Sequence, residues 1–439
     1  MSLRPSASST MDPSPASPGA SMPLLRRVRR VGPVLALSLV LAACAGDAPQ
    51  DTFKPEGRYA RISYDLIMPV FGIAAVVFFG VLIGTVVIGL KFRASDDEDF
   101  DDIPVQIHGH NTLEIGWTIL PALILAVVAV FSVAAIFQLA EEPDSDLRIE
   151  VIGHQWWWEY RYDVDGDGSF DGPDDIVTAN DLVIPADVEI GLEITSRDVI
   201  HSWWAPRLNG KRDAVPNRWH PWNIHADEPG EYIGQCTEFC GLSHAEMRIK
   251  VVALEPADFD RWLTEQQQDA PTFAEDDTSL EAEGYRVFTG QLCASCHLIE
   301  GVNDENFSDE GLQEWERPIM GGKGTITDPE LQASRHAPNL THLFSRSTFA
   351  GAKFNLRKST EYCDGLGIDW AQDPDDFDRC FDRSALEDWL RDPPAHKAMQ
   401  PEAVEGRSTV RGMPDLGLSE EQIDQLTAYL ATLGRSNDE

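Results

Sequence analysis

The sequence predicts a membrane-anchored, multidomain protein: a two-helix transmembrane hairpin, then a β-sandwich, then an all-α domain. Three observations predict this order. Two long, uncharged apolar stretches lie before residue 140, short alternating strands separated by Gly, Pro and Asp follow, and helical apolar spacing returns near the C-terminus. With 439 residues, the chain is long enough for two or three domains with separate cores.

The charge of the chain excludes one class of partner. There are 35 Lys and Arg residues against 73 Asp and Glu residues, which gives a net charge of -38 at pH 7. Binding of nucleic acid requires basic surfaces, so we expect no nucleic-acid partner. An acidic field of this size favours basic soluble proteins instead.

The N-terminus carries a targeting signal. Four arginines within residues 26–30 precede an apolar run at 31–41, and small residues lead into Cys44. This order is typical of a secretory signal peptide, which we place at residues 1–43. The tetrapeptide that ends at Cys44 resembles a bacterial lipobox, so we expect a lipidated Cys44 to begin an exported segment at 44–64.

The hairpin is predicted at residues 65–140 from two apolar stretches, Leu66 to Leu90 and Ile115 to Leu139, neither of which contains a charged residue. One charge at the bilayer centre costs roughly 2.5–3.5 kcal/mol, so its absence favours membrane spans over the alternative of buried soluble helices. Lys91 and Arg93 follow the first span, which places the intervening loop in the cytoplasm by the positive-inside rule. Everything after the second span is then outside.

The β-sandwich is predicted at residues 146–265. Apolar and polar residues alternate at 147–151, as in a half-buried strand, and the runs 189–195 and 248–254 have the same character.

A linker and a helical domain follow. Residues 266–278 are rich in Gln, Asp and Pro and have no apolar period. The domain at 279–436 ends in apolar residues at helical spacing within 423–433, and Ser419 with Gln422 predicts a capping box before them.

One short segment gathers the ligands of a metal site. Cys236, Cys240, His244 and Met247 fall within twelve residues. Thiolate, thioether and imidazole together favour copper, and two cysteines four residues apart can bridge two ions, each of which needs its own histidine. His201 is the best second histidine. The alternative, a disulfide between the two cysteines, explains neither His244 nor Met247.

With the upstream His201-Ser202-Trp203, this pattern resembles subunit II of bacterial haem-copper cytochrome c oxidases. The resemblance implies a cupredoxin-like sandwich with a binuclear copper centre, CuA. The implied ligands are the bridging thiolates of Cys236 and Cys240, the imidazoles of His201 and His244, the thioether of Met247 and the backbone carbonyl of Glu238.

The same resemblance implies two further features. The side chain of Glu238 would reach a Mg²⁺ ion at the boundary with subunit I, with Asp213 as a second candidate ligand. The aromatic run Trp156 to Trp158 resembles the family's Gln-Trp-Tyr-Trp, and it makes Trp156 the exposed ring through which electrons enter from cytochrome c. Core packing is the alternative for at least one of these rings.

The hairpin agrees with this family. The segment His110 to Trp117, with Pro121, resembles the start of the second transmembrane helix. Glu114 then lies where an acidic residue marks the cytoplasmic entrance of a proton pathway into subunit I. The alternative is a carboxylate that only stabilises a helix N-terminus.

A second redox group is predicted at Cys293, Cys296 and His297, because a Cys-x-x-Cys-His run is a haem-attachment signature in which the histidine binds the iron. The preceding helix around 284–288 and the later Pro338 resemble class I cytochrome c. In that family the carbonyl at the Pro338 position orients the proximal histidine.

The distal ligand of a class I cytochrome is implied to be methionine, which raises the reduction potential. Met413 lies just before the capped C-terminal helix, as the axial methionine does in many members, and Met399 is the alternative.

Two acidic insertions, 302–335 and 356–383, depart from a minimal cytochrome c. The second contains Cys363 and Cys380, which we expect to form a disulfide in an oxidising compartment.

One weaker motif is the acidic run Asp163 to Gly168 with Asp174 at the twelfth position, which fits a calcium loop except for its final Asp. Its flanks are predicted strands, so we prefer an acidic hairpin tip over a Ca²⁺ site.

Together these features predict a relay on the outer face of the bacterial plasma membrane. Cytochrome c or a cytochrome bc complex would reduce the haem c, which reduces CuA, and subunit I would reduce oxygen to water with proton translocation. The expected partners are subunit I, other oxidase subunits and membrane lipid. A quinol oxidase subunit would lack the copper ligands, and a nitrous oxide reductase would add a propeller domain. A lipoprotein that binds calcium or scaffolds a complex would contain neither copper nor covalent haem.

Overall fold

The computed structural model describes residues 48–93, 108–143, 145–168, 170, 175–291, 293–303, 337–358, 363, 379–399 and 412–434. The signal peptide, Cys44, Asp174 and most of both acidic insertions lie outside the described residues.

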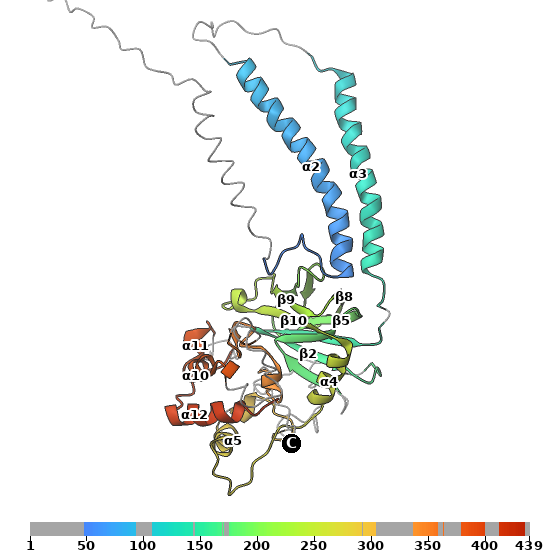
Figure 1. The fold of residues 1–439 in the computed structure, drawn as a ribbon. Coiled ribbons are helices and arrows are strands. Elements are labelled where there is room, and N and C mark those ends of the chain that lie inside the picture. Colours follow the sequence, from blue (N-terminus) through green and yellow to red (C-terminus); the bar gives the residue numbers. More distant parts are fainter. Residues whose placement is uncertain are drawn as a thin grey trace, which may run out of the picture. The chain divides into compact units, whose positions relative to one another are not determined.

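Two long helices form the predicted hairpin, α2 (Arg58–Lys91) and α3 (Asn111–Leu139) (Figure 1). Both are long and apolar enough to cross a membrane, and most of their large apolar side chains are exposed, as contact with lipid requires. The ring of His110 caps α3 by accepting a hydrogen bond from the amide of Leu113. Helix α2 begins at Arg58 rather than at the predicted Leu66.

The early start of α2 anchors the hairpin to the sandwich. Tyr59 is 1% exposed, and its hydroxyl donates to the carboxylate of Glu189 over 3.0 Å. Arg58 pairs with the same carboxylate, and Arg61 pairs with Asp227. These polar contacts do not follow the apolar pattern from which the span was predicted, so the additional turns were missed.

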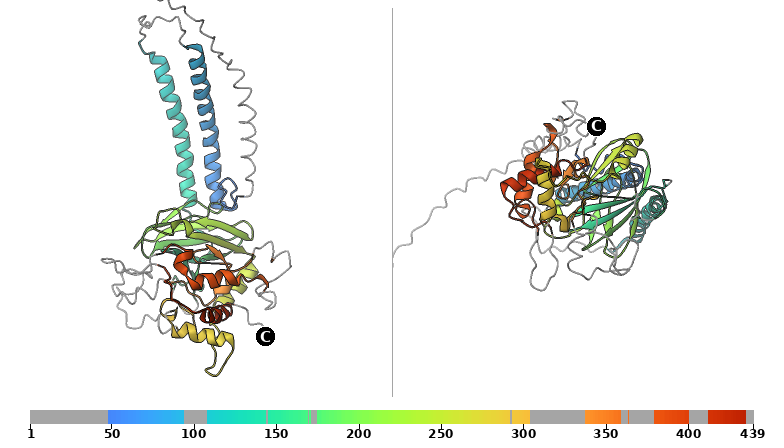
Figure 2. Two further views of the ribbon diagram at one scale, coloured as in Figure 1. Left: turned by 90° about the vertical axis from the view of Figure 1, so that its left-hand side faces the viewer. Right: turned by 90° about the horizontal axis from the view of Figure 1, so that it is seen from below.

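The sandwich contains a five-stranded sheet in the order β3-β2-β1-β5-β8 and a three-stranded sheet in the order β4-β10-β9 (Figures 1 and 2). Strands β1 and β5 are parallel, as are β4 and β10, and the other pairs are antiparallel. A short antiparallel pair, β6-β7, lies beside them. The strands are β1 (Arg148–His154), β2 (Trp157–Asp163), β3 (Ile176–Ala179), β4 (Asp181–Pro185), β5 (Glu189–Ser196), β6 (His201–Trp203), β7 (Arg212–Ala214), β8 (His220–His225), β9 (Gly230–Gln235) and β10 (Arg248–Leu254).

The core between the sheets is aromatic and aliphatic. Trp158, Tyr160 and Trp203 are fully buried. Helix α4 (Pro256–Gln266) closes the sandwich by packing Phe259 and Trp262 against this core.

The C-terminal part has its own core and is mainly helical. Helices α5 (Leu280–Gly290) and α12 (Glu420–Leu430) pack closely at Gly284. A Cβ at this position would lie 2.0 Å from the carbonyl oxygen of Gln425, so the close packing requires glycine. The predicted capping box of Ser419 and Gln422 begins α12. The remaining elements are α6 (Cys293–Cys296), the 3-10 turn η3 (Leu343–Ser345), β11 (Thr348–Phe349), β12 (Phe354–Asn355), α10 (Arg383–Arg391) and α11 (Pro393–His396).

The C-terminal part is not purely helical. β11 and β12 form a short antiparallel pair in which the rings of Phe349 and Phe354 lie 5.3 Å apart. Ala350, Gly351 and Ala352 between them all have positive φ, so this turn gave no periodic signal in the sequence.

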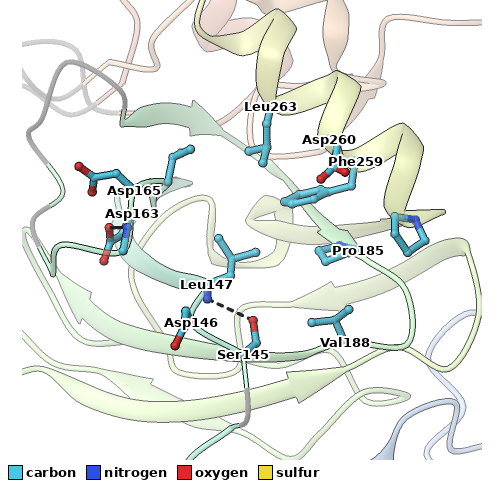
Figure 3. A pocket seen from close by; sticks show the side chains of 13 residues that line it. Ser145, Asp146, Leu147, Asp163, Asp165, Pro185, Val188, Phe259, Asp260 and Leu263 are labelled. Atoms are coloured by element: carbon cyan, nitrogen blue, oxygen red, sulfur yellow. Dashed lines mark hydrogen bonds between the residues drawn. The ribbon is translucent and has the colours of Figure 1, made fainter.

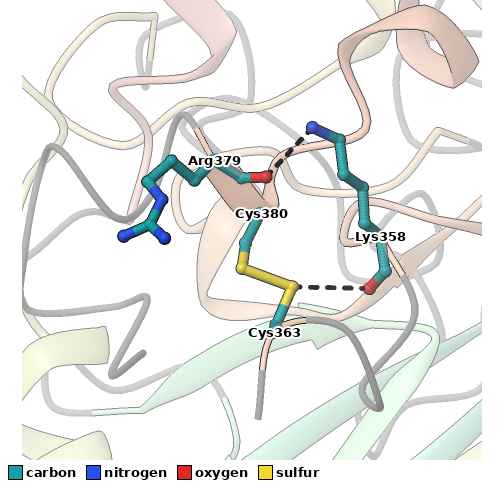
Figure 4. The surroundings of a disulfide bond; sticks show 4 residues. All are labelled: Lys358, Cys363, Arg379 and Cys380. Carbon is teal, nitrogen blue, oxygen red and sulfur yellow. Dashed lines mark hydrogen bonds between the residues drawn. A yellow bond between two sulfur atoms is a disulfide. The ribbon is translucent and has the colours of Figure 1, made fainter. Parts of the chain in front are cut away.

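The structure pairs Cys363 with Cys380 in a disulfide, with 5.8 Å between the Cα atoms (Figure 4). Both cysteines are buried, and the main chain beside them is tied by a 2.7 Å hydrogen bond from the amide of Lys358 to the carbonyl of Cys380. A bridge across 17 residues stabilises the fold by about 3 kcal/mol.

Candidate copper and haem sites

The six predicted copper ligands come together at one end of the sandwich. The two thiol sulfurs of Cys236 and Cys240 lie 3.8 Å apart. Cys240 Sγ lies 3.5 Å from His244 Nδ1 and 3.9 Å from Met247 Sδ, and Cys236 Sγ lies 3.4 Å from the carbonyl oxygen of Glu238. The imidazole of His201 completes a group with both thiols whose ligand atoms all lie within 4.8 Å of one another.

This ligand group fits a metal on physical grounds. His201 is fully buried and its Nδ1 has no hydrogen-bond partner among the described residues, which is costly unless a metal takes the lone pair. Cys236, Cys240 and Met247 are at most 3% exposed. Sulfur and imidazole donors in a dry site are the combination that copper prefers.

The two thiols are electrostatically coupled. The hydrogen bond between them lowers the pKa of Cys236 and raises the pKa of Cys240. Because cysteine binds a metal as the thiolate, metal uptake and proton release are linked.

A buried carboxylate orients His201. Asp198 Oδ1 lies 2.8 Å from His201 Nε2, and the carboxylate also accepts from the amides of Gln155 (2.7 Å) and Val199 (2.6 Å). Burial raises the pKa of Asp198, but its hydrogen bond to His201 and the nearby positive charge outweigh this and lower the pKa to about 2. Because Nε2 is held by Asp198, Nδ1 is the nitrogen left for metal.

Space for that imidazole comes from a glycine. A Cβ at Gly153 would lie 2.8 Å from Cδ2 of His201 and 3.2 Å from the ring of Trp158. Neither Gly153 nor Asp198 was predicted from the sequence to belong to the site. An Asp three residues before a ligand histidine is the sequence signal that could have indicated Asp198.

Trp156 does not have the exposed ring that the resemblance implied. It is 4% exposed, and its Nε1 donates to the carbonyl oxygen of Cys240 over 3.0 Å. The side-chain amide of Gln155 donates to the same carbonyl over 2.6 Å. The carbonyl of Trp156 is itself covered by the C-terminal domain, because it accepts a 2.7 Å hydrogen bond from Lys397. The expectation of an exposed ring was therefore wrong.

The predicted magnesium and proton residues lie at exposed positions. Glu238 and Asp213 are both exposed, on the copper loop and on β7 respectively. Glu114 is exposed in the first turn of α3.

The structure describes the three residues that the sequence predicts for haem attachment. Cys293 and Cys296 begin and end α6 with free thiols, and His297 follows directly. Nδ1 of His297 lies 2.8 Å from the carbonyl oxygen of Pro338, as the resemblance implied. Nε2 is then left for iron, and burial lowers the pKa of His297 so that the imidazole is neutral and can act as a ligand.

The two candidate distal ligands pack against different cores. Met413 packs against the hydrophobic core of the C-terminal domain, whereas Met399 packs against that of the sandwich. The side chain of Met399 also lies against Gly412, the neighbour of Met413, so both methionines lie in one region and the choice between them stays a prediction.

The acidic run forms a hairpin tip beside an open pocket of about 360 Å³ (Figure 3). Asp163, Asp165 and Asp175 lie close together, while Asp174 is outside the described residues. The carboxylate of Asp163 accepts from the amides of Gly166 and Gly168 over 2.8 and 3.0 Å, so it holds the turn. This geometry fits the preferred interpretation of an acidic hairpin tip.

Known proteins match both halves of the predicted scaffold. Residues 147–254 match the family model "Cytochrome C oxidase subunit II, periplasmic domain", and residues 63–135 match the transmembrane domain of the same subunit. The cytochrome c oxidase subunit 2 of Alkalihalophilus pseudofirmus is 31% identical over 324 residues, which cover 71% of this chain and 89% of the relative. That of Bacillus sp. strain PS3 is 28% identical over 411 residues, which cover 90% and 95%.

Among solved structures, the periplasmic domain of subunit II of cytochrome oxidase from Bradyrhizobium japonicum is 27% identical, with a TM-score of 0.26. The match covers 29% of this chain and 96% of that one. The relative from Alkalihalophilus pseudofirmus is matched over most of its length, and both family models match where the hairpin and the sandwich lie. The chain therefore belongs to the cytochrome c oxidase subunit II family, whose members are the copper-containing, membrane-anchored electron-transfer subunits of that oxidoreductase.

Proposed function

We propose that this chain carries two redox centres and passes electrons from its own covalent haem c to a binuclear CuA centre, and from there to subunit I. The observation that carries this proposal is the convergence of six copper ligands around a buried, unpartnered imidazole nitrogen, in a chain that also presents a haem-attachment helix. The copper pair, when bound, takes up and releases one electron at a time.

The copper ligands have distinct roles in this proposal. Cys236 and Cys240 would hold the copper ions as thiolates, and their sulfurs lie 3.8 Å apart on one loop. His201 and His244 would add one imidazole each. Met247, beside Cys240, and the carbonyl of Glu238, beside Cys236, would complete the set. The dry, preformed pocket limits reorganisation when the charge changes.

The haem would be held by thioether bonds to Cys293 and Cys296 and ligated by His297 and Met413. The carbonyl of Pro338 fixes the orientation of the His297 ring. The PS3 relative supports a C-terminal domain that is shared within the family, because a match over 90% of this chain must extend beyond the sandwich.

The remaining parts of the proposal concern the position of the relay in its complex. Lys91 and Arg93 put the inter-helix loop in the cytoplasm, so the copper and haem domains would face outward. Glu114 would then stand at the side from which protons enter subunit I. Glu238, with Asp213 as a second candidate, would contribute to a Mg²⁺ site shared with subunit I.

The test is metal and haem analysis of the membrane-extracted full chain, with electron paramagnetic resonance. We expect two coppers per chain in a mixed-valence signal and one covalent haem. Cys236→Ser should abolish the copper signal and leave the haem, and Cys296→Ser should do the reverse. The control Cys363→Ser/Cys380→Ser removes the disulfide elsewhere in the chain and should leave both centres. A mononuclear copper spectrum in the wild type would contradict the proposal.

A further inference from the structure

The seam between the C-terminal domain and the sandwich is polar and buried. The amide of Ser347 donates to the carboxylate of Asp181 on β4 over 2.9 Å, and the amide of Arg248 on β10 donates to the carbonyl of Gly351 over 2.9 Å. The guanidinium of Arg346, 4% exposed, donates to Thr178 on β3 over 3.1 Å. Such directional contacts fix one docking geometry.

One buried lysine lies where the seam meets the copper site. Lys397 is 3% exposed, and its Nζ donates to the carbonyl oxygens of Trp156 (2.7 Å) and Ala350 (2.6 Å). It thus joins one residue of the sandwich to one turn of the C-terminal domain. Burying an ammonium costs several kcal/mol unless hydrogen bonds compensate, so both acceptors are needed for docking.

The turn at Gly351 fits closely over Trp156. A Cβ at Gly351 would lie 2.5 Å from the carbonyl oxygen of Trp156 and 3.2 Å from that of Glu246. On its other side, Trp156 donates through Nε1 to the carbonyl of Cys240, a predicted copper ligand. Trp156 therefore connects the seam to the copper site and presents almost no surface to solvent.

We propose that Lys397 and the turn 346–351 form a latch that holds the C-terminal domain over Trp156, which closes this residue to any separate electron-carrying protein. This inference rests on the proposed function, because it assigns the covered route to the chain's own haem. One electron leaves the ferrous haem iron, which becomes ferric, and the copper pair accepts that one electron. No proton or bond is exchanged. A soluble donor must then deliver its electron to the haem domain.

The latch is tested by amide hydrogen exchange on the full chain in detergent. The reporters are the amides of Arg248 and Ser347, whose acceptors lie across the seam. In Lys397→Met we expect both to exchange about tenfold faster, the effect of losing one net hydrogen bond of about 1.4 kcal/mol. The control Lys358→Met removes an exposed lysine of the same domain that bonds within it, and it should change neither amide.

A second variant changes a residue on the sandwich side of the seam. Asp181→Asn weakens the acceptor of Ser347 and Thr348 and should also speed exchange at the seam. In both variants the amide of Ile423 in α12 should stay protected, which shows that the domain remains folded. If Lys397→Met unfolds the domain, Asp181→Asn decides the question. Unchanged exchange at the seam in the folded variants would overturn the latch.

The electron route gives a separate readout. A ferrous soluble cytochrome is mixed with the oxidised chain while haem and copper absorption are followed separately. In the wild type we expect haem reduction to precede copper reduction, whereas opening the latch should allow copper to be reduced without that delay. Direct copper reduction in the wild type would refute the latch. Absence of copper or haem would refute the proposed function alone, because the exchange comparison requires neither.

Discussion

The sharpest prediction concerns Asp198, which lies behind a copper ligand without touching copper. Its carboxylate accepts three hydrogen bonds, from the ring of His201 and the amides of Gln155 and Val199. In Asp198→Asn the side chain keeps one accepting oxygen and gains an NH₂ group that opposes a buried amide donor. The imidazole then loses its charged partner and its fixed orientation.

The magnitude follows from the place of Asp198 in the site. Loss of a partner that orients a ligand histidine lowers metal affinity by about 10–100-fold, or about 1.4–2.7 kcal/mol. A hydrogen bond to a charged group contributes about 1.5–3 kcal/mol, which agrees with this range. Because the pKa of Asp198 is lowered to about 2, the carboxylate is ionised throughout the neutral range and the loss should not depend on pH there.

The assay is copper titration of the full chain against a competing chelator, with the mixed-valence resonance signal as the readout. The control is Asp187→Asn, the same chemical change at a side chain of the same sandwich that is 89% exposed and has a positive φ that asparagine accepts. It should bind copper as the wild type does. Wild-type copper affinity in Asp198→Asn would show that the carboxylate only caps the loop.

Three other changes test the site and its anchoring. Gly153→Ala places a methyl carbon 2.8 Å from the ring of His201, so copper affinity should fall at least about tenfold in the same titration. Met413→Ala should lose the absorption band of methionine-ligated haem; retention of that band would exclude Met413. The hydrogen bond from Arg61 on α2 lowers the pKa of Asp227. The stability that this pair contributes is therefore complete above about pH 4 and is lost as the pH falls further. Acid should lower the thermal midpoint about 1–2 °C more in the wild type than in Asp227→Asn. Equal acid sensitivity would contradict that role. Each variant has a control that makes the same change elsewhere: Gly210→Ala for Gly153→Ala, Met399→Ala for Met413→Ala, and Asp187→Asn for Asp227→Asn.

The ligands could be predicted from the sequence because they are local. Cys236, Cys240, His244 and Met247 lie on one loop, so their spacing alone brings them together. His201 lies far away in the chain, and it was identified through the resemblance of His201-Ser202-Trp203 to the family's pattern. Asp198 was missed because an aspartate at a strand end is commonplace until the fold buries it.

Residues that join domains were beyond prediction for a related reason. Nothing in the sequence around Lys397 distinguishes it from a solvated lysine. The exposed ring of Trp156 was inferred from the resemblance, although the sequence also predicted a fused cytochrome c domain. The contact between Lys397 and the carbonyl of Trp156 joins segments more than 200 positions apart. Periodicity and motif spacing carry no information at that distance.

The position of Lys397 also explains why an acidic chain would use a buried lysine at this point. A protein with a net charge of -38 attracts basic soluble partners to any exposed acidic or aromatic surface, including one beside its copper site. The side chain of Lys397 donates to the carbonyl of Trp156 and so holds one particular domain there. A competing protein that displaced this domain would have to supply its own donor to that carbonyl in the same dry space. Removing the side chain would weaken docking without adding a new attraction. The latch therefore selects the covalently tethered partner, whose local concentration is high, over a free partner that general electrostatic attraction alone would favour.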